Sequence, residues 1–127
     1  MTTVTSEVRI NLLIAEHVMD YKPCDDPVGR CDAARMDPPR CWGPVVNGQI
    51  HGSDLRDYCN PTWFPQDVWD RMVRWSHERN WEPAIHAEKS GRYQVSFMFG
   101  CGRRADTLTM AIALAALEAH GLHELEP

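Results

Sequence analysis

The sequence has no apolar run long enough to cross a lipid bilayer, which needs about 20 residues. Its longest apolar stretch covers only residues 110–117. It has no excess of positive charge either, because 13 Lys and Arg stand against 18 Asp and Glu, and this argues against a broad nucleic-acid footprint. The first residues, Met-Thr-Thr-Val-Thr-Ser, lack the basic start and the apolar block of a secretory signal. We therefore expect a cytoplasmic protein that binds neither a membrane nor nucleic acid at large.

The five cysteines lack the close pairs of a structural zinc site, in which two ligands stand two to four residues apart. Neighbouring cysteines are separated by at least six residues, and their number is odd. In a reducing compartment this pattern favours reduced thiols without a metal or other cofactor. The alternative is a zinc site that holds the irregular middle of the chain, with His51 nearby. The cysteines are Cys24, Cys31, Cys41, Cys59 and Cys101.

The stretch from Asp106 to Gly121 predicts the central element of a single domain that covers residues 1–127. Asp106 is a suitable N-cap residue, and Gly121 stands where a helix commonly ends. Every residue from 110 to 117 is apolar, and a helix that is apolar all round is covered on more than one side. We expect the other elements to pack around this helix, and a homodimer interface is the alternative cover.

Residues 6–20 and 61–79 are predicted to form two further helices, because apolar side chains recur there at three- and four-residue spacing. In the first helix this spacing places His17 on the apolar face and Asn11 on the outer side. The second helix has one apolar side that carries Trp69 and one charged side that faces solvent.

Residues 81–99 alternate between apolar and polar side chains on both sides of Lys89-Ser90-Gly91, which predicts a hairpin of two strands. Residues 21–60 form an irregular segment with one short ribbon at 45–50, where Asn47-Gly48 is typical of a type I′ turn. The fold class is therefore α+β, with a small antiparallel sheet. The expected order is helix, ribbon, helix, strand, strand, helix.

Three pieces of the chain carry a resemblance to a known family. They are residues 10–19, the sequence Asp57-Tyr58-Cys59-Asn60 ahead of the helix that bears Trp69, and residues 105–117. Together they resemble the small bacteriophage proteins of the phage ABA sandwich domain type, outside residues 22–55. The resemblance implies a small antiparallel sheet flanked by helices, as an α-β-α sandwich, and a phage accessory protein in the bacterial cytoplasm. It assigns no catalytic residues to this chain.

A candidate anion site precedes the closing helix. Helix N-termini carry unpaired N–H groups and partial positive charge, glycines allow close backbone approach, and arginines offer forked donors to phosphate. The spacing is neither that of a P-loop nor that of a dinucleotide fingerprint. The alternative is a plain glycine turn with two solvated arginines, and the carboxylate of Asp106 would compete with an anion. The site residues are Gly100, Cys101, Gly102, Arg103 and Arg104.

These observations favour a non-enzymatic binder of a small anionic molecule, such as a nucleotide signal of host defence. Its base would stack on an aromatic side chain, for which Trp42, Tyr58 and Trp63 are the candidates. The second hypothesis is an inhibitor that docks on a host protein through residues 21–60. The third is a small metal- or cysteine-dependent enzyme using Cys101 and His86, although the sequence shows no signature of such a pair.

Overall fold

The structure is a computed structural model that describes residues 6–25, 31–36, 38–98 and 102–122. The helices in this part are α1 (Ser6–Leu13), which continues as the π-helical turn η1 (Ile14–Val18), the 3₁₀ turn η2 (Ala33–Arg35), α2 (Gln66–Glu78) and α3 (Leu108–Ala119). The strands are β1 (Lys22–Pro23), β2 (Cys41–Gly43), β3 (Val45–Val46), β4 (Gln49–Ile50), β5 (Ser53–Asp54), β6 (Ala84–Ala87), β7 (Tyr93–Ser96) and β8 (Arg103–Ala105). The predicted α+β class is confirmed.

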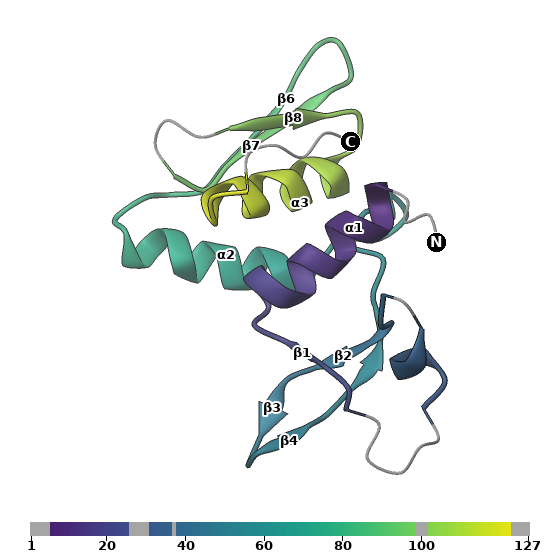
Figure 1. Cartoon of the computed structure of the whole chain (residues 1–127). Helices are drawn as coiled ribbons and strands as arrows, with labels where there is room; N and C mark the ends of the chain where they lie inside the picture. The colour runs from purple at the N-terminus through teal and green to yellow at the C-terminus, as the bar shows by residue number, and fades with distance from the viewer. Residues whose placement is uncertain (1–5, 26–30, 37, 99–101, 123–127) are drawn as a thin grey trace.

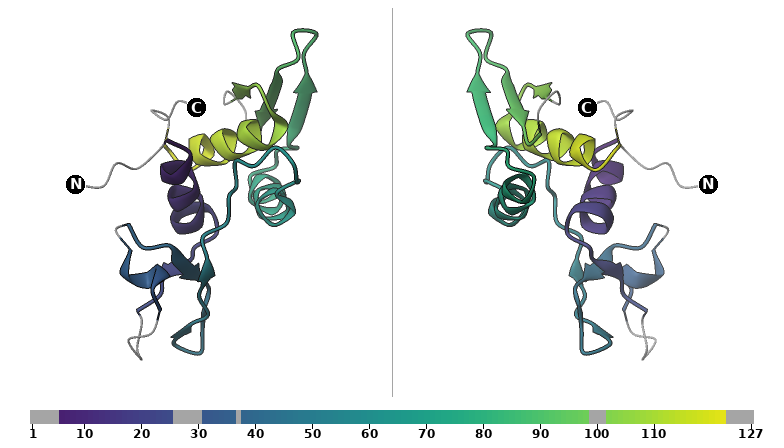
Figure 2. Two further views of the ribbon diagram at one scale, coloured as in Figure 1. Left: turned by 90° about the vertical axis from the view of Figure 1, so that its right-hand side faces the viewer. Right: turned by 90° about the vertical axis from the view of Figure 1, so that its left-hand side faces the viewer.

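Helix α3 is the central element, which the other two long helices and the sheet β6–β7–β8 contact. It packs against β7 and β8 on one side and against α1, η1 and α2 on the other (Figures 1 and 2). Residues 111–117 are all buried, so the prediction of a helix covered on several sides is confirmed. The layers are the sheet, then α3, then the other two helices, and the sandwich order implied by the resemblance is not confirmed.

The start of α3 differs from the prediction by one residue. Thr107, not Asp106, is the N-cap, and its Oγ1 accepts a hydrogen bond from the backbone N–H of Met110 at 3.2 Å. The reason is that a strand runs up to Ala105, and this leaves Thr107 in the extended conformation that an N-cap requires. The predicted end is confirmed, because Gly121 has a φ of 87° directly after the helix.

The sheet β6–β7–β8 has one strand more than the sequence predicted. The hairpin β6–β7 is present, with Gly91 at a φ of 90° in its turn. The additional strand β8 pairs antiparallel with β7, and Tyr93 lies opposite Ala105. The prediction placed the two arginines of β8 in a glycine turn before the helix. A strand of three residues with two charges shows no alternation that a sequence pattern can detect.

The first helix buries different side chains from those predicted. Ile10, Ile14 and Val18 are buried as expected, but His17 is exposed and Asn11 is only 6% exposed. The helix widens into a π turn from Ile14, so the α-helical spacing behind the placement of His17 does not hold there. Asn11 is buried because the connection before α2 lies over it.

Helix α2 begins at Gln66, five residues later than the predicted start at residue 61. Residues 61–63 form a turn and a bend instead, and the Asn60 side chain accepts hydrogen bonds from the backbone N–H and the hydroxyl of Thr62 at 2.9 and 2.7 Å. The predicted apolar side is confirmed, because Val68 and Met72 are buried.

A second body of the molecule, which we call the small lobe, consists of the described part of residues 22–55. It contains the three-stranded sheet β1-β2-β5 and the ribbon β3-β4, and it extends away from the helices (Figure 1). The ribbon is confirmed, with positive φ of 52° and 78° at Asn47 and Gly48. The three-stranded sheet was not predicted, because its strands are only two or three residues long.

None of the described helices is long and apolar enough to span a membrane.

Candidate functional site

The described part of the predicted anion site holds a carboxylate from its own chain. The backbone N–H of Gly102 donates to Glu118 Oε1 at 3.0 Å, and Arg103 Nη1 lies 3.6 Å from Glu118 Oε2. The side chains of Arg103 and Glu118 are only 13% and 14% exposed. Glu118 stands in the last turn of α3, so this pair ties β8 to the far end of the helix. Gly100 and Cys101 lie outside the described residues.

Arg103 and Arg104 do not converge on one point. Neighbouring residues of a strand point to opposite faces, and Arg104 accordingly has a different partner: its Nε lies 3.3 Å from Glu88 Oε1. Its side chain is more than half exposed. Binding of a phosphate by the two arginines together stays a prediction, and the geometry gives each of them a carboxylate of its own.

Two of the three predicted stacking aromatics belong to the core. Trp42 in β2 is buried, and its indole N–H donates to the carbonyl of Pro39 at 2.9 Å. Tyr58 is 2% exposed, and burial raises the pKa of its hydroxyl. Both line a cavity of about 90 Å³ next to the small lobe, whereas β8 lies at the other end of the molecule (Figure 1). They are therefore far from the predicted anion site.

Trp63, the third aromatic, lies in an open cleft at the amino end of α3. The cleft has a volume of about 460 Å³, which is within the range of small-molecule sites. Aromatic rings and hydroxyl groups share its walls with the first turn of the helix. Its lining residues are Pro61, Thr62, Trp63, Phe64, Tyr93, Asp106, Thr107, Leu108 and Thr109.

Local contacts position the walls of this cleft. The hydroxyl of Thr109 donates to the carbonyl of Trp63 at 3.2 Å, which fixes the loop before α2 against the start of α3. Asp106 lies at the rim, and Arg92 Nε is 3.5 Å from its carboxylate. Arg92 thus offsets the one carboxylate among the lining residues. The arrangement suits a flat ring against the aromatics and an anionic group near the helix end.

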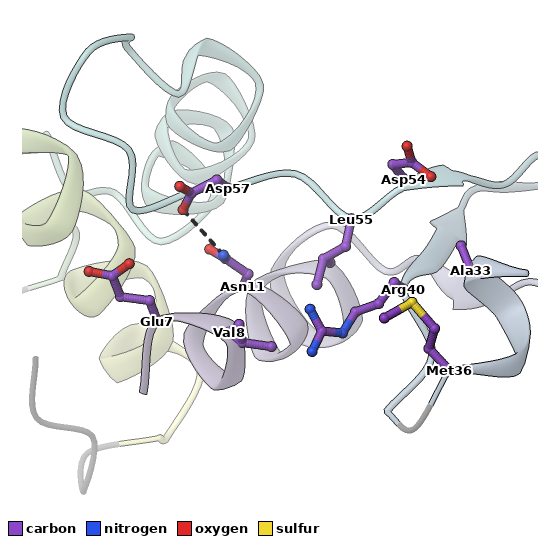
Figure 3. Close-up of a pocket in the computed structure, with 9 residues that line it drawn as sticks. All are labelled: Glu7, Val8, Asn11, Ala33, Met36, Arg40, Asp54, Leu55 and Asp57. Carbon is purple, nitrogen blue, oxygen red and sulfur yellow. Dashed lines mark hydrogen bonds between the residues drawn. The ribbon is translucent and has the colours of Figure 1, made fainter. Parts of the chain in front are cut away.

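A second open cleft lies between α1 and the small lobe, with a volume of about 450 Å³. Figure 3 shows the guanidinium of Arg40 in it, close to Val8 of α1 and Leu55. Three carboxylates also line this cleft, from Glu7, Asp54 and Asp57, so an anionic ligand would be repelled. Asn11 at the edge of this cleft donates to Asp57 Oδ1 at 3.3 Å and accepts from the backbone N–H of Tyr58 at 2.8 Å. These two hydrogen bonds hold α1 against the connection before α2, so this edge of the cleft has a structural role.

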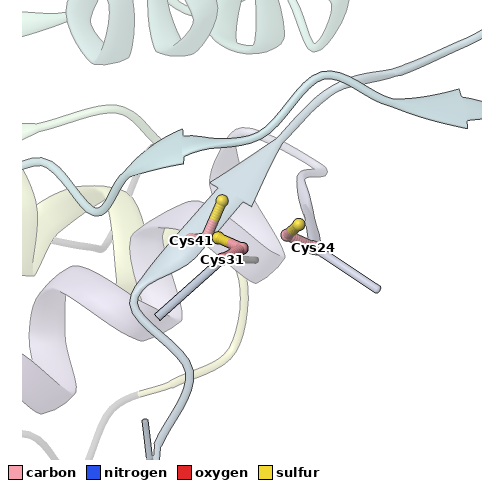
Figure 4. Close-up of side chains that lie close together, drawn as sticks. All are labelled: Cys24, Cys31 and Cys41. Atoms are coloured by element: carbon pink, nitrogen blue, oxygen red, sulfur yellow. The ribbon is translucent and has the colours of Figure 1, made fainter. Parts of the chain in front are cut away.

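Three cysteines that are far apart in the sequence come together in the small lobe. The Sγ atoms of Cys24, Cys31 and Cys41 all lie within 4.8 Å of one another. Figure 4 shows the three side chains next to each other, with Cys41 on β2. The wide spacing of these three cysteines in the sequence did not predict that they group together. No local signal in the sequence shows this group, because it depends on the pairing of β1 with β2, next to which the backbone N–H of Cys24 donates to the carbonyl of Cys41 at 2.8 Å.

The fourth described cysteine and the predicted Cys–His pair lie elsewhere. Cys59 is buried next to Asn11, and its Sγ donates to Asn11 Oδ1 at 3.6 Å. His86 is exposed on β6. Its predicted partner Cys101 lies outside the described residues, so the hypothesis of a cysteine-dependent enzyme stays a prediction.

A search of solved structures finds one fold similar to the whole chain. It is the 2.0 Å crystal structure of a phage protein from Bacillus cereus ATCC 14579, with a TM-score of 0.56 and 19% sequence identity. The match covers 94% of this chain and 90% of the other. A scan of protein-family models and a search of curated proteins find no match. This chain therefore shares a fold with a phage protein.

Proposed function

We propose that the chain is a phage-type accessory protein that works by binding rather than catalysis, and that it captures a small anionic molecule with a flat ring, such as a nucleotide. The observation that carries the proposal is the cleft at the amino end of α3, where Trp63, Phe64 and Tyr93 stand beside the first turn of the helix. The fold shared with a phage protein supports the phage setting. Removal of a nucleotide signal of host defence is the role that fits such a binder.

The cleft provides two kinds of interaction that a nucleotide needs. A base stacked on an aromatic side chain gains about 1–3 kcal/mol, and Trp63 is the half-buried indole of the cleft. The N-terminal end of a helix attracts an anion through its N–H groups and its dipole. The proposal thus keeps Trp63 from the predicted site and moves the anion from the arginine pair to the start of α3.

A thermal-shift screen against cyclic and linear nucleotides tests this proposal. A ligand that binds the folded chain at a concentration 100 times its Kd stabilises it by about 2.7 kcal/mol, which raises the melting temperature. We expect at least one nucleotide to raise the melting temperature of the wild type and not that of Trp63→Ala. Trp81→Ala is the matched control, because Trp81 is an indole of similar burial outside the cleft. A screen without a shift, or equal shifts in Trp63→Ala, would contradict the proposal.

A second candidate function is docking on a host protein through the small lobe. The observation in its favour is the ribbon β3–β4, on which Val45 and Val46 are 50% and 46% exposed. Exposed β-branched residues on a short edge ribbon suit pairing with another strand. Co-purification from the bacterial host with wild type and Val45→Ser/Val46→Ser tests it: a host protein retained only by the wild type supports docking, and equal retention contradicts it.

A further inference from the structure

We propose that Cys24, Cys31 and Cys41 bind one Zn²⁺ ion through their thiolates, and that this ion holds the small lobe together. The proposal is independent of the cleft at α3. It rests on the position of the three sulfur atoms, on the burial of Cys41 and on the small number of buried positions in the described part of the lobe.

The sulfur atoms have nearly the spacing that zinc requires. A Zn–S bond is about 2.3 Å long, so two sulfurs of a tetrahedral site are about 3.8 Å apart. The three Sγ atoms lie within 4.8 Å of one another, and side-chain movements of roughly 1 Å would close them around an ion. A disulfide would use two of the sulfurs and leave the third, whereas one zinc ion uses all three. Soft thiolate ligands in this arrangement select zinc over magnesium or calcium.

When no cation is present, the deprotonated form of Cys41 is unfavourable in this cluster. Burial, together with the neighbouring thiols of Cys31 and Cys24, raises the pKa of Cys41 to about 12. At neutral pH the Cys41 side chain is therefore a neutral thiol in the metal-free chain. A bound zinc ion reverses this preference, because its charge favours the deprotonated ligand.

The surrounding backbone is shaped to pass close to the sulfurs. A Cβ atom added at Gly52 would lie 2.6 Å from Cys41 Sγ and 3.2 Å from Cys24 Cβ, so a side chain at position 52 would displace the cluster. The segment that contains Gly52 leads into β5, which pairs with β2 beside Cys41. His51 precedes Gly52, but among the described residues the group of ligand atoms contains the three cysteines alone.

The lobe needs such a clamp because its own core is minimal. Its strands have two or three residues each, and its buried positions among the described residues are 41–43 of β2. Small units without a sufficient core are commonly stabilised by a structural metal. The three ligands come from the residue after β1, from the residue before the turn that includes η2, and from β2. One ion would therefore join the three separate parts of the lobe to each other.

The direct test is the zinc content of the full chain. The chain is produced in medium with added Zn²⁺, passed over a chelating resin and analysed by mass spectrometry for metal. We expect about one zinc per wild-type chain, about one in the control Cys59→Ser, and a loss of most of the zinc in Cys41→Ser and Gly52→Ala. Zinc-free wild type, or equal zinc in wild type and Cys41→Ser, would overturn the proposal.

A spectroscopic measurement on the wild type covers the case in which Cys41→Ser does not fold. Co²⁺ is titrated into the metal-free wild-type chain, and the absorption spectrum is recorded. Thiolate ligands in a tetrahedral site give sulfur-to-cobalt charge-transfer bands together with intense visible bands, and Zn²⁺ should then displace the cobalt and abolish both. A spectrum equal to that of Co²⁺ in water would overturn the proposal.

Discussion

At the scale of single residues, Glu118 joins strand β8 and the residue before it to the last turn of helix α3. Its carboxylate accepts from the N–H of Gly102 and lies beside the guanidinium of Arg103, and both side chains are mostly buried. If the cationic partner of such a mostly buried carboxylate is removed, nothing offsets the free-energy cost of burying the remaining charge. Arg103 and Glu118 therefore have a structural role, whereas Arg104, the next residue after Arg103, has a mostly exposed side chain.

We predict that Arg103→Ala lowers the free energy of unfolding by about 1–3 kcal/mol, because Glu118 would keep a mostly buried charge without its cation. Arg104→Ala is the matched control and should cost less than about 1 kcal/mol, since Arg104 forms an exposed ion pair. Urea denaturation followed by circular dichroism measures both. Equal costs in the two variants would show that Arg103 is an ordinary surface charge.

His120 gives the chain a pH-dependent contribution to stability. Its ring lies 5.6 Å from that of Trp75, and burial, followed by the nearby charges of Arg79, His17 and Arg71, lowers the pKa of His120 below its ordinary value of 6.5. The folded chain therefore binds this proton less readily than the unfolded chain. Stability is fully present above about pH 6.5 and is lost as the pH falls below this value.

The corresponding prediction compares the unfolding free energy at about pH 7.5 and about pH 5.5. We expect His120→Gln to lose less stability than the wild type between these two conditions. The control His86→Gln, changed at an exposed position of β6, should lose as much as the wild type. If His120→Gln loses as much as the control, His120 does not titrate differently in the folded and unfolded chains.

At the scale of elements, α3 should be the least tolerant of truncated side chains. Ile112 is fully buried between the sheet and the other helices, so Ile112→Ala should cost about 2–5 kcal/mol. Met110→Ala, at a partly exposed position of the same helix, should cost less. Thermal unfolding with analytical ultracentrifugation checks both stability and mass. A variant that remains stable but changes its oligomeric state would instead assign α3 to an interface between chains.

The elements that the sequence predicted are those with a long or strongly periodic pattern. The apolar run 110–117, the amphipathic spacing of α2 and the Asn47-Gly48 turn each have a local cause that a pattern shows. Strands β1, β2 and β5 of the small lobe, and strand β8, were missed because each has two or three residues and depends on a partner distant in the sequence. The burial of Asn11 was missed for a related reason, since its partner Tyr58 is 47 residues away.

The candidate sites also combine features that are local in the sequence with features that depend on tertiary contacts. The start of the closing helix and Trp63, which line the proposed cleft, could be named from the sequence because a helix boundary and an aromatic residue are local features. The partnership of Arg103 with Glu118 and the grouping of three cysteines were not found. Both arise from tertiary contacts, between β8 and the last turn of α3 and between β1 and β2. Neither spacing matches a known motif.

At the scale of the whole molecule, the chain has two bodies with different sources of stability. The helices and the sheet β6–β7–β8 pack around α3, whereas the small lobe has few buried side chains and the cysteine cluster (Figures 1 and 2). The proposed ligand cleft belongs to the first body and the proposed zinc ion to the second. Each proposal can therefore be tested without disturbing the other.

The central functional claim is that a nucleotide binds at the start of α3 and not at the arginine pair. Calorimetric titration of the wild type, Trp63→Ala and Arg103→Gln/Arg104→Gln, with the nucleotide that gives the largest thermal shift, tests it most directly. We predict that Trp63→Ala raises the Kd by roughly 5- to 150-fold, which corresponds to the loss of one stacked base, while the arginine variant keeps its affinity within about threefold. Unchanged affinity in Trp63→Ala together with lost binding in the arginine variant would contradict the claim and place the anion at Arg103 and Arg104.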